Sequence, residues 1–449
     1  MRQILDLHIH SKYSRSCSPE LTLENIGAAC RIKGVDIIAT GDFTFPAWFA
    51  DIKNKLEEIP LPPFVKGGEY SGLYKLKSAK DDKVKFILSS EVALIYKDGG
   101  KCRRIHLVIH APNIEAAEKL NNFLDKKYNI RSDGRPILGM SAVELCKLCF
   151  GIHPKFLIYP AHIWTPWFAV FGSKSGFDKI EECFHEYAKN IYALETGLSS
   201  DPEMNWRLSA LDGLTILSNS DAHSLPNIAR EANVFEMKNI GYDEIYDIIK
   251  NKKIFSRDVI HSCCKTVVDK KNNPEKSGME FTIEFYPEEG MYHYDGHRDC
   301  GVVFSPEQTE RLKGVCPVCK KSLTVGVMSR VSELADRPAG FKLKNAAPFK
   351  KLVELDKIIA QAIDVKSRHS KKVKFEYANL IKSAGNELDI LLNISLKDLS
   401  KITGAAIVEA IGRAREGKLI INPGFDGQYG EIKIFSEQEK KKNKQRSLF

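Results

Sequence analysis

The stretch from Ile4 to His10 constrains the fold of this 449-residue chain more than any other. It is predicted to be a β-strand, in which side chains alternate between two faces. The apolar residues on one face are Leu5, Leu7 and Ile9. Asp6, His8 and His10 share the opposite face. Three metal-competent side chains on one face favour a metal site, and the alternative is a solvated edge strand that happens to hold two histidines.

Predicted strands and helices alternate through residue 260. The strands are 35–40, 85–90, 104–110, 156–160, 191–194 and 214–217, with helices at 22–34 and 114–123. Thr22 is a suitable N-cap for the first helix, and Gly34 is suitable just past its end. This alternation predicts a parallel α/β arrangement, most simply a barrel, in which the chemistry lies at the carboxyl ends of the strands.

Metal-competent residues recur at those predicted strand ends. They are His8, His10, Asp42, Glu91, His106, His162, Asp221 and His223. Imidazole and carboxylate together suit Zn, Mn or Fe, and a carboxylate can bridge two cations. A cluster of two or three cations can bind a phosphodiester and activate water. Any one of these histidines could instead be a buried structural residue, but the set predicts a metal centre.

The sequence changes character after residue 260. A strand is predicted at 279–286, followed by short Gly- and Cys-containing elements at 292–324 and by helices from Phe349 onward. The spacing of His297, Cys300, Cys316 and Cys319 predicts a tetrahedral structural zinc. His293 is a rival for the fourth ligand. By contrast, Cys146 and Cys149 are predicted to lie on the buried face of a helix.

The formal charge of +9 is spread unevenly. Residues 1–260 carry 34 Lys and Arg against 33 Asp and Glu, and residues 261–449 carry 33 against 25. A polyanionic partner, most simply nucleic acid, is therefore predicted for the C-terminal part, although solvated basic faces are also common. Eleven irregularly spaced cysteines indicate reduced thiols and metal ligands. With no long apolar run, a cytoplasmic, nucleoid-associated protein without a membrane span is expected.

Several motifs resemble the polymerase-and-histidinol-phosphatase (PHP) metallohydrolase domain. They are the segments 6–10 (DLHIH), 40–42 (TGD) and 220–223 (SDAH), together with Glu91 and His162. The PHP domain is a distorted (β/α)7 barrel that holds up to three metals. Longer strings at 160–167, 172–177, 193–201 and 423–427 resemble its endonuclease Q branch in particular. Members of that branch nick DNA on the 5′ side of uracil, hypoxanthine, xanthine and abasic sites.

The resemblance implies a role for each matching residue. His8, His10, Glu91 and Asp221 would hold one cation, with Glu91 bridging to a second that His106 and His162 complete. Asp42 and His223 would hold a third cation or position water, so the implied catalytic residues are Asp221, Glu91, His223 and Asp42. The cluster metals would be Zn, Mn or Mg. His110, which shares a strand face with His106, is expected to be structural.

One departure from the family pattern concerns the third cation. Phe43 and Phe45 stand where many relatives have histidine, so that site is expected to be weak or absent.

Residues near the implied metals are candidates for DNA contacts. Trp164 and Trp167 follow His162 and could stack on or wedge beside an exposed base, or could simply cap the barrel mouth. Lys174 lies in a Gly- and Ser-containing loop and is a candidate phosphate contact. Weaker candidates are Ser199, Ser200 and Arg207.

The C-terminal peptide carries a further resemblance. Gln445, Leu448 and Phe449 resemble the short peptide by which DNA-processing proteins bind the bacterial sliding clamp.

Four segments are therefore predicted: a PHP domain (1–260), a zinc-binding module (261–345), a basic helical DNA-binding domain (346–435) and a disordered tail (436–449). The resemblance implies a metal-dependent endonuclease for DNA with deaminated or abasic nucleotides. The alternatives are a small-molecule phosphatase of the histidinol-phosphatase type and a non-catalytic DNA-binding scaffold.

Overall fold

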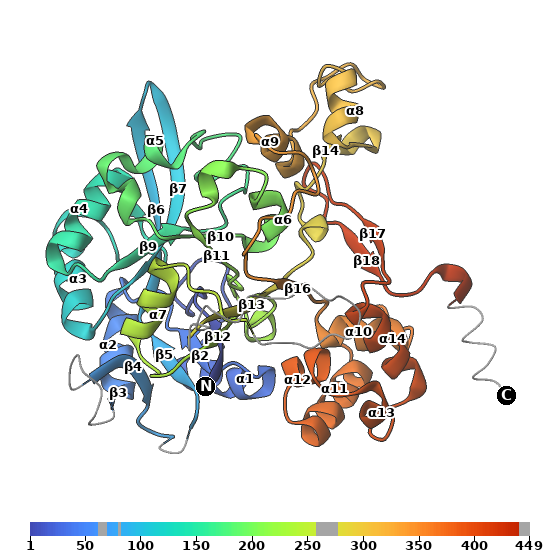
Figure 1. The fold of residues 1–449 in the computed structure, drawn as a ribbon, viewed down its shortest axis with the longest axis horizontal. Coiled ribbons are helices and arrows are strands. Elements are labelled where there is room, and N and C mark those ends of the chain that lie inside the picture. Colours follow the sequence, from blue (N-terminus) through green and yellow to red (C-terminus); the bar gives the residue numbers. More distant parts are fainter. Residues whose placement is uncertain (62–69, 80–81, 257–276, 440–449) are drawn as a thin grey trace, which may run out of the picture.

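The computed structural model describes residues 1–61, 70–79, 82–256 and 277–439. Figure 1 shows an α/β body built from the N-terminal part of the chain, a small lobe beside it, and a group of helices near the C-terminus. The lobe contains β14 (Asp295–His297), β15 (Val302–Phe304), α8 (Pro306–Arg311) and α9 (Val327–Leu334). The C-terminal helices are α10 (Leu355–Ala362), α11 (Lys371–Ala384), α12 (Glu387–Leu392), α13 (Leu396–Leu399) and α14 (Ala405–Arg415), beside the hairpin of β17 (Ile420–Asn422) and β18 (Glu431–Lys433). Among the described residues, no helix combines the length and apolar character that crossing a bilayer requires.

The largest sheet has eight strands in the order β16-β13-β12-β1-β2-β5-β4-β3. Their bounds are β1 Arg2–Asp6, β2 Ile37–Ala39, β3 Leu56–Pro60, β4 Tyr70–Leu76, β5 Lys85–Ile87, β12 Ala232–Glu236, β13 Gly278–Glu284 and β16 Phe349–Lys351. A four-stranded sheet, β8-β6-β7-β9, and the pair β10-β11 complete the body. These strands span β6 Ser89–Asp98, β7 Lys101–His110, β8 Ile137–Leu138, β9 Leu157–Pro160, β10 Ala193–Glu195 and β11 Thr215–Leu217.

Seven α-helices belong to the described part of the body. They are α1 (Leu23–Lys33), α2 (Pro46–Lys55), α3 (Ile114–Lys127), α4 (Ala142–Ile152), α5 (Ile180–Phe184), α6 (Pro202–Asn205) and α7 (Tyr242–Lys250). α1 begins and ends as predicted, because the Thr22 side chain accepts a hydrogen bond from the Asn25 N–H and Gly34 adopts a left-handed conformation. Cys146 and Cys149 are buried in α4, as the helical pattern predicts.

The predicted all-parallel arrangement is only partly right. β1, β2 and β5 pair in parallel, and so do β10 and β11. β6 and β7, however, form a long antiparallel hairpin. Its turn is Gly99-Gly100, and both glycines have positive φ (55° and 75°), as a two-residue hairpin turn requires. The fold of the body is therefore mixed α/β.

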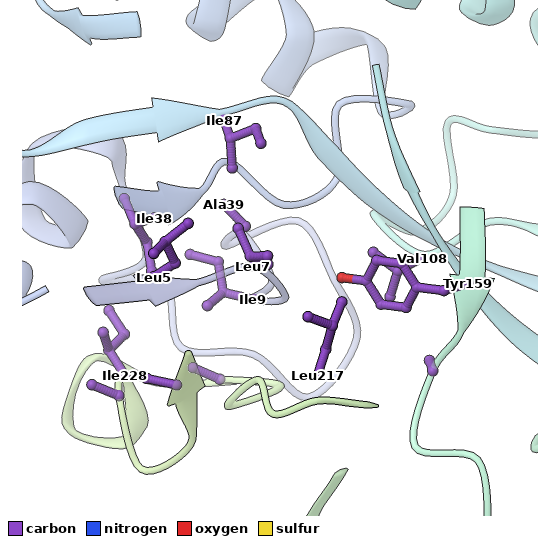
Figure 2. Packing of buried hydrophobic residues seen from close by; sticks show 14 of the residues in the cluster. Leu5, Leu7, Ile9, Ile38, Ala39, Ile87, Val108, Tyr159, Leu217 and Ile228 are labelled. Atoms are coloured by element: carbon purple, nitrogen blue, oxygen red, sulfur yellow. The ribbon is translucent and has the colours of Figure 1, made fainter. Parts of the chain in front are cut away.

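The core under β1 holds the N-terminal strand in place. Leu5, Leu7 and Ile9 pack among residues from neighbouring strands, including Ile38 and Ile87 (Figure 2). Ladder pairing ends at Asp6, earlier than predicted, but the backbone continues extended and Ile9 bridges Ala222 beyond β11. This bridge places residues 8–10 beside residues 221–223.

The main sheet includes two strands that follow residue 260. β13 and β16 belong to it, because β13 pairs with β12 and β16 pairs with β13. Helical structure was predicted from Phe349 onward, but Phe349–Lys351 is β16 and the first C-terminal helix, α10, begins at Leu355. The small lobe has an apolar cluster of its own, built on Val302, Cys316 and Leu323.

A buried pair of carboxyl groups predicts a pH dependence of stability. Burial raises the pKa of Glu284 to about 7 and that of its neighbour Glu231 well above 4.5, and Glu231 Oε2 has no hydrogen-bond partner among the described residues. Because the folded chain holds these protons more tightly than the unfolded chain, this stabilisation is present below about pH 4.5 and is lost as the pH rises through about 7.

We expect Glu231→Gln to stabilise the protein at pH 8 by about 2 kcal/mol and to leave it unchanged near pH 4.5. Thermal unfolding of both proteins at the two pH values measures this. An equal change in stability at both would contradict the explanation.

Candidate metal centre

Glu91 lies between two groups of side chains that could each hold a cation. The first group is His8, His10, Glu91 and Asp221, and the second is Glu91, His106 and His162. In each group the ligand atoms lie within 4.8 Å of one another. The structure thus brings together residues from β6, β7 and the ends of β1, β9 and β11, as the recurrence of polar strand ends predicts.

The first group presents lone pairs without partners. His10 Nε2 is 3.1 Å from Asp221 Oδ1 and 3.3 Å from Glu91 Oε2, and His8 Nε2 is 3.8 Å from the same two atoms. His8 Nε2, His10 Nε2 and Asp221 Oδ1 are buried and form no hydrogen bond with the described residues. Buried polar atoms rarely lack a partner, so this donor set fits a divalent cation.

The second group is tighter. Glu91 Oε1 lies 2.8 Å from His106 Nδ1 and 3.1 Å from His162 Nε2, and the two imidazole nitrogens are 3.2 Å apart. Burial lowers the pKa of His106 to about 4, so this imidazole is neutral at pH 7, as a metal ligand must be. The His162 ring is held from behind by Thr165, whose Oγ1 is 3.0 Å from His162 Nδ1.

Two buried carboxylates orient the histidines of the first group. Glu195 Oε2 is 3.0 Å from His8 Nδ1, and Asp42 Oδ1 is 3.0 Å from His10 Nδ1. An ionised carboxylate can only accept, so each ring carries a proton on Nδ1, and Nε2 is the nitrogen left to face a cation. Carboxylates behind metal-binding histidines fix the tautomer and raise the basicity of the ligand in this way.

The resemblance implied that Asp42 holds a third cation or positions water, and in the structure its Oδ1 lies beside His10 Nδ1. Its second oxygen, Oδ2, accepts hydrogen bonds from the Ser11 N–H and from the hydroxyls of Ser11 and Ser14. Phe43 is buried, and Phe45 stacks on Tyr13 with ring centroids 4.5 Å apart. Both oxygens of the Asp42 carboxylate therefore have partners, and positions 43 and 45 supply phenyl rings rather than imidazoles.

His223 and Asp6 are not members of either group. His223 Nδ1 is 2.8 Å from the Asp221 backbone oxygen, and the ring centroid of His223 is 4.6 Å from that of His10. Asp6 does not face the metal centre: its oxygens accept from the Ser220 and Ala229 N–H groups. It ties the chain after β11 to β1, and burial raises its pKa to about 6.

The turns that carry the site are conformationally constrained. Asp42, His162 and Asp221 all have positive φ, at 46°, 26° and 45°. Non-glycine residues rarely adopt this region, and such conformations gather at functional sites where the surrounding structure holds them.

Two residues with no predicted role contact the site. One is Glu195 on β10, whose Oε2 is 3.0 Å from His8 Nδ1. The other is Arg135, whose Nη1 lies 3.0 Å from Glu91 Oε2. Burial disfavours the ionised form of Glu91, yet His106 and Arg135 hold its pKa well below 4.5. Nothing in the local sequence around Arg135 indicates this contact.

A cavity of about 620 Å³ adjoins the metal centre. On one side it is lined by His162, Asp221 and His223, and on the other by residues that follow the main sheet, among them Met291, Tyr292 and Lys357. Ser199 also lines it, with a buried hydroxyl that has no partner among the described residues. Trp167 is 39% exposed and meets Tyr292 edge to face, with centroids 5.3 Å apart.

Three of the candidate DNA contacts have hydrogen-bond partners within the chain. Trp164 is fully buried, and its Nε1 donates to Asn205 Oδ1. Ser200 is also buried and donates to the Thr196 backbone oxygen. Arg207 binds the 332–337 segment through the Ser332 hydroxyl and the Arg337 backbone oxygen.

His110 is buried beside the Tyr159 hydroxyl, consistent with its expected structural role.

The small lobe contains the third metal-competent group. His297, Cys300, Cys316 and Cys319 come within 4.8 Å of one another. His293, the rival ligand, lines the cavity beside the metal centre and is not part of this group. Backbone N–H groups at Cys319 and Val318 lower the pKa of the Cys316 thiol, which favours the thiolate that zinc requires.

We expect Glu195→Gln to weaken metal binding about 10- to 100-fold, because the amide cannot hold the His8 tautomer as a carboxylate does. Titration of metal-stripped protein with Mn²⁺, followed by calorimetry, measures the affinity. Glu181→Gln, at an exposed position of α5, is the matched control. Equal affinity in the wild type and in Glu195→Gln would exclude the proposed coupling.

Parts of this chain, and nearly the whole of it, are similar to known proteins. Residues 354–418 match the family described as MJ0043 C-terminal domain. The uncharacterized protein MJ0043 of Methanocaldococcus jannaschii is 33% identical over 275 residues, which are 60% of this chain and 31% of that protein. The chain thus spans about a third of the length of this curated relative.

The crystal structure of the lesion-specific endonuclease PfuEndoQ from Pyrococcus furiosus matches 98% of this chain and 97% of its own, with a TM-score of 0.79 and 28% identity. Over nearly its whole length, this chain is similar to endonuclease Q. A second structure, endonuclease Q with a 27-mer duplex carrying an abasic lesion at the active site, has a TM-score of 0.78 and 28% identity and covers 97% of this chain and 98% of its own. The likeness to endonuclease Q thus includes the body, the small lobe and the C-terminal helices.

Proposed function

We propose that this chain is a member of the endonuclease Q family and a metal-dependent DNA repair endonuclease. It would nick the phosphodiester 5′ to deaminated bases or abasic sites. The observation that carries the proposal is Glu91, which faces two adjacent groups of metal-competent side chains beside an open cavity. The DNA-bound endonuclease Q structure, similar over nearly the whole chain, supports the same substrate class.

The residues of the metal centre would have separate roles in cation binding, proton transfer and charge stabilisation. The first group and the second group would each hold one divalent cation (Zn, Mn or Mg), with Glu91 shared. Such cations supply charge neutralisation at phosphorus and activation of water. His223 lies at the cavity rim and is free to hold or move a proton there, and the Arg135 guanidinium adds a positive charge beside Glu91.

The cavity would receive the damaged nucleotide. A nuclease acting beside an altered base must take that base out of the stack. Trp167 and Tyr292 stand at its side as an aromatic pair, and the Ser199 hydroxyl is available as a hydrogen-bonding group inside it. The likeness to DNA-bound endonuclease Q supports this use of the cavity.

Three finer features belong to the same proposal. The strands of the body would form a distorted PHP-type barrel, with the Ile9–Ala222 bridge joining the chain after β11 to β1. His297, Cys300, Cys316 and Cys319 would hold one structural zinc. The C-terminal peptide Gln445, Leu448 and Phe449 would bind the sliding clamp; it lies outside the described residues.

The test is a set of labelled duplexes with a single uracil, hypoxanthine or abasic site, incubated with Mg²⁺ or Mn²⁺. We expect one nick on the 5′ side of each lesion and none in undamaged DNA. Phosphate release from a small monoester without nicking would indicate a phosphatase instead. Binding without cutting would indicate a scaffold.

A further inference from the structure

A second cavity of about 620 Å³ is lined by Trp167, which contacts Tyr292 in the lining of the first. We call it the basic groove. It runs between the start of β7, the loop 172–178 and α9, and its basic side chains are Lys101, Arg103, Arg104, Lys174 and Arg330. The acidic residues that line it are Asp178, Glu182 and Glu333. The groove thus has an excess of positive charge.

Two of the three acidic side chains of the groove form ion pairs, and the third, Glu182, accepts a hydrogen bond from the Asp178 N–H. Arg330 forms ion pairs with Asp178 and Glu333, and it also donates to the backbone oxygens of Phe171 and Phe177. Lys101, Arg104 and Lys174 are exposed, and none has an ion-pair partner among the described residues. Three cations are therefore available to an external anion.

A hydrogen bond and a cation–π contact hold the walls of the groove together. Arg103 donates to the Gly176 backbone oxygen and stacks its guanidinium 4.0 Å from the centroid of Phe177. This contact holds the loop that carries Lys174 against β7. The groove also contains two buried polar atoms without a partner among the described residues, Ser173 Oγ and Arg103 Nε. Such atoms indicate a missing hydrogen-bonding ligand.

The groove includes the start of β7, the strand that also carries His106, a candidate metal ligand. Arg104 and His106 lie two residues apart on one face of β7, which is a separation of about 7 Å, and Lys101 is about 17 Å from His106 along the strand. At about 3.4 Å of axis per nucleotide, these distances correspond to about two and five nucleotides. Trp167 lines the groove and touches Tyr292, which lines the cavity at the metals.

We infer that the basic groove binds the phosphodiester backbone of the substrate DNA about two to five nucleotides from the scissile phosphate, on one side of the lesion only. This inference rests on the proposed function for the position of the scissile phosphate. The groove contributes affinity that does not depend on base sequence, because its available groups are ammonium, guanidinium and hydroxyl groups suited to phosphate.

The test compares Lys101→Gln/Arg104→Gln/Lys174→Gln with the wild type in binding an undamaged duplex at several salt concentrations. We expect the slope of log K against log salt to fall by about 2 to 3 and affinity at low salt to fall at least about tenfold. The control Lys119→Gln/Lys126→Gln/Lys147→Gln changes the same charge at exposed positions of α3 and α4 and should leave the slope unchanged. Equal slopes for the groove variant and the wild type would overturn the inference, whether or not the protein nicks DNA.

A second measurement locates the contact. Nicking at low substrate concentration is compared on three uracil duplexes. One is full-length, and each of the other two is trimmed to about two base pairs on one side of the lesion, one on the 5′ side and one on the 3′ side. The groove variant should be slower than the wild type on the full duplex and on one trimmed duplex, and should match it on the other. A defect of equal size on all three duplexes would contradict binding at this distance.

Discussion

Glu91→Gln is expected to abolish nicking. Glutamine keeps the size of the side chain but removes the charge that two cations would share, so both groups of ligands lose their common carboxylate. The rate at saturating DNA should fall by at least about 10³-fold, which corresponds to about 4 kcal/mol of lost transition-state stabilisation. Affinity for lesion-containing duplex should remain close to that of the wild type, because Glu91 is buried behind the histidines.

The metal content of the purified protein provides an independent readout. Asp221→Asn removes a carboxylate from the first group only, so it should lower the number of bound cations by about one while Glu91→Gln lowers it further. Glu118→Gln, at a partly exposed salt bridge with Lys53, is the control and should change neither metal content nor rate. If Glu91→Gln nicked DNA at the wild-type rate, the cluster would have no part in the reaction.

Cys316→Ser is expected to unfold the small lobe. Cys316 is fully buried and packs with Val302 and Leu323, so it would act both as a zinc ligand and as a member of the lobe's small core. Zinc binding supplies about 10 to 16 kcal/mol in small domains of this kind, far more than so small a core provides. The variant should lose one zinc per chain and become sensitive to proteolysis within residues 295–324.

Three further variants make the zinc prediction specific. His297→Ala should also lose the zinc, whereas His293→Ala should retain it, because only His297 lies beside the thiols. Cys102→Ser changes an exposed cysteine outside the group and should leave the zinc content unchanged. Retention of zinc by Cys316→Ser would show that these four residues do not form the site.

The metal-competent groups could be predicted because their pattern is local and repeated. Each ligand follows or lies on a strand, and strands of an α/β body bring their ends to a common edge whatever the intervening helices contain. The capping of α1 by Thr22 and Gly34 is equally local, since a helix end needs its partners within a few residues.

The surroundings of the ligands could not be predicted in this way. Glu195 contacts His8 across 187 residues of sequence, and Arg135 contacts Glu91 across 44. Trp164 and Trp167 are three residues apart, yet one is buried and the other is 39% exposed, because the loop after His162 turns between them. Such outcomes depend on which segments pack together rather than on residue type.

The amino-acid sequence by itself determined the α/β class of the body, the presence of metal-competent residues and the zinc spacing, since periodicity and motif spacing are properties of the chain. Only the tertiary structure decided that the Asp42 carboxylate lies 3.0 Å from His10 Nδ1, that His223 lines the cavity beside the metal centre, and that β13 and β16 extend the main sheet. The physical reason is that a buried carboxylate takes whichever donors surround it, and those donors come from segments that only folding brings together.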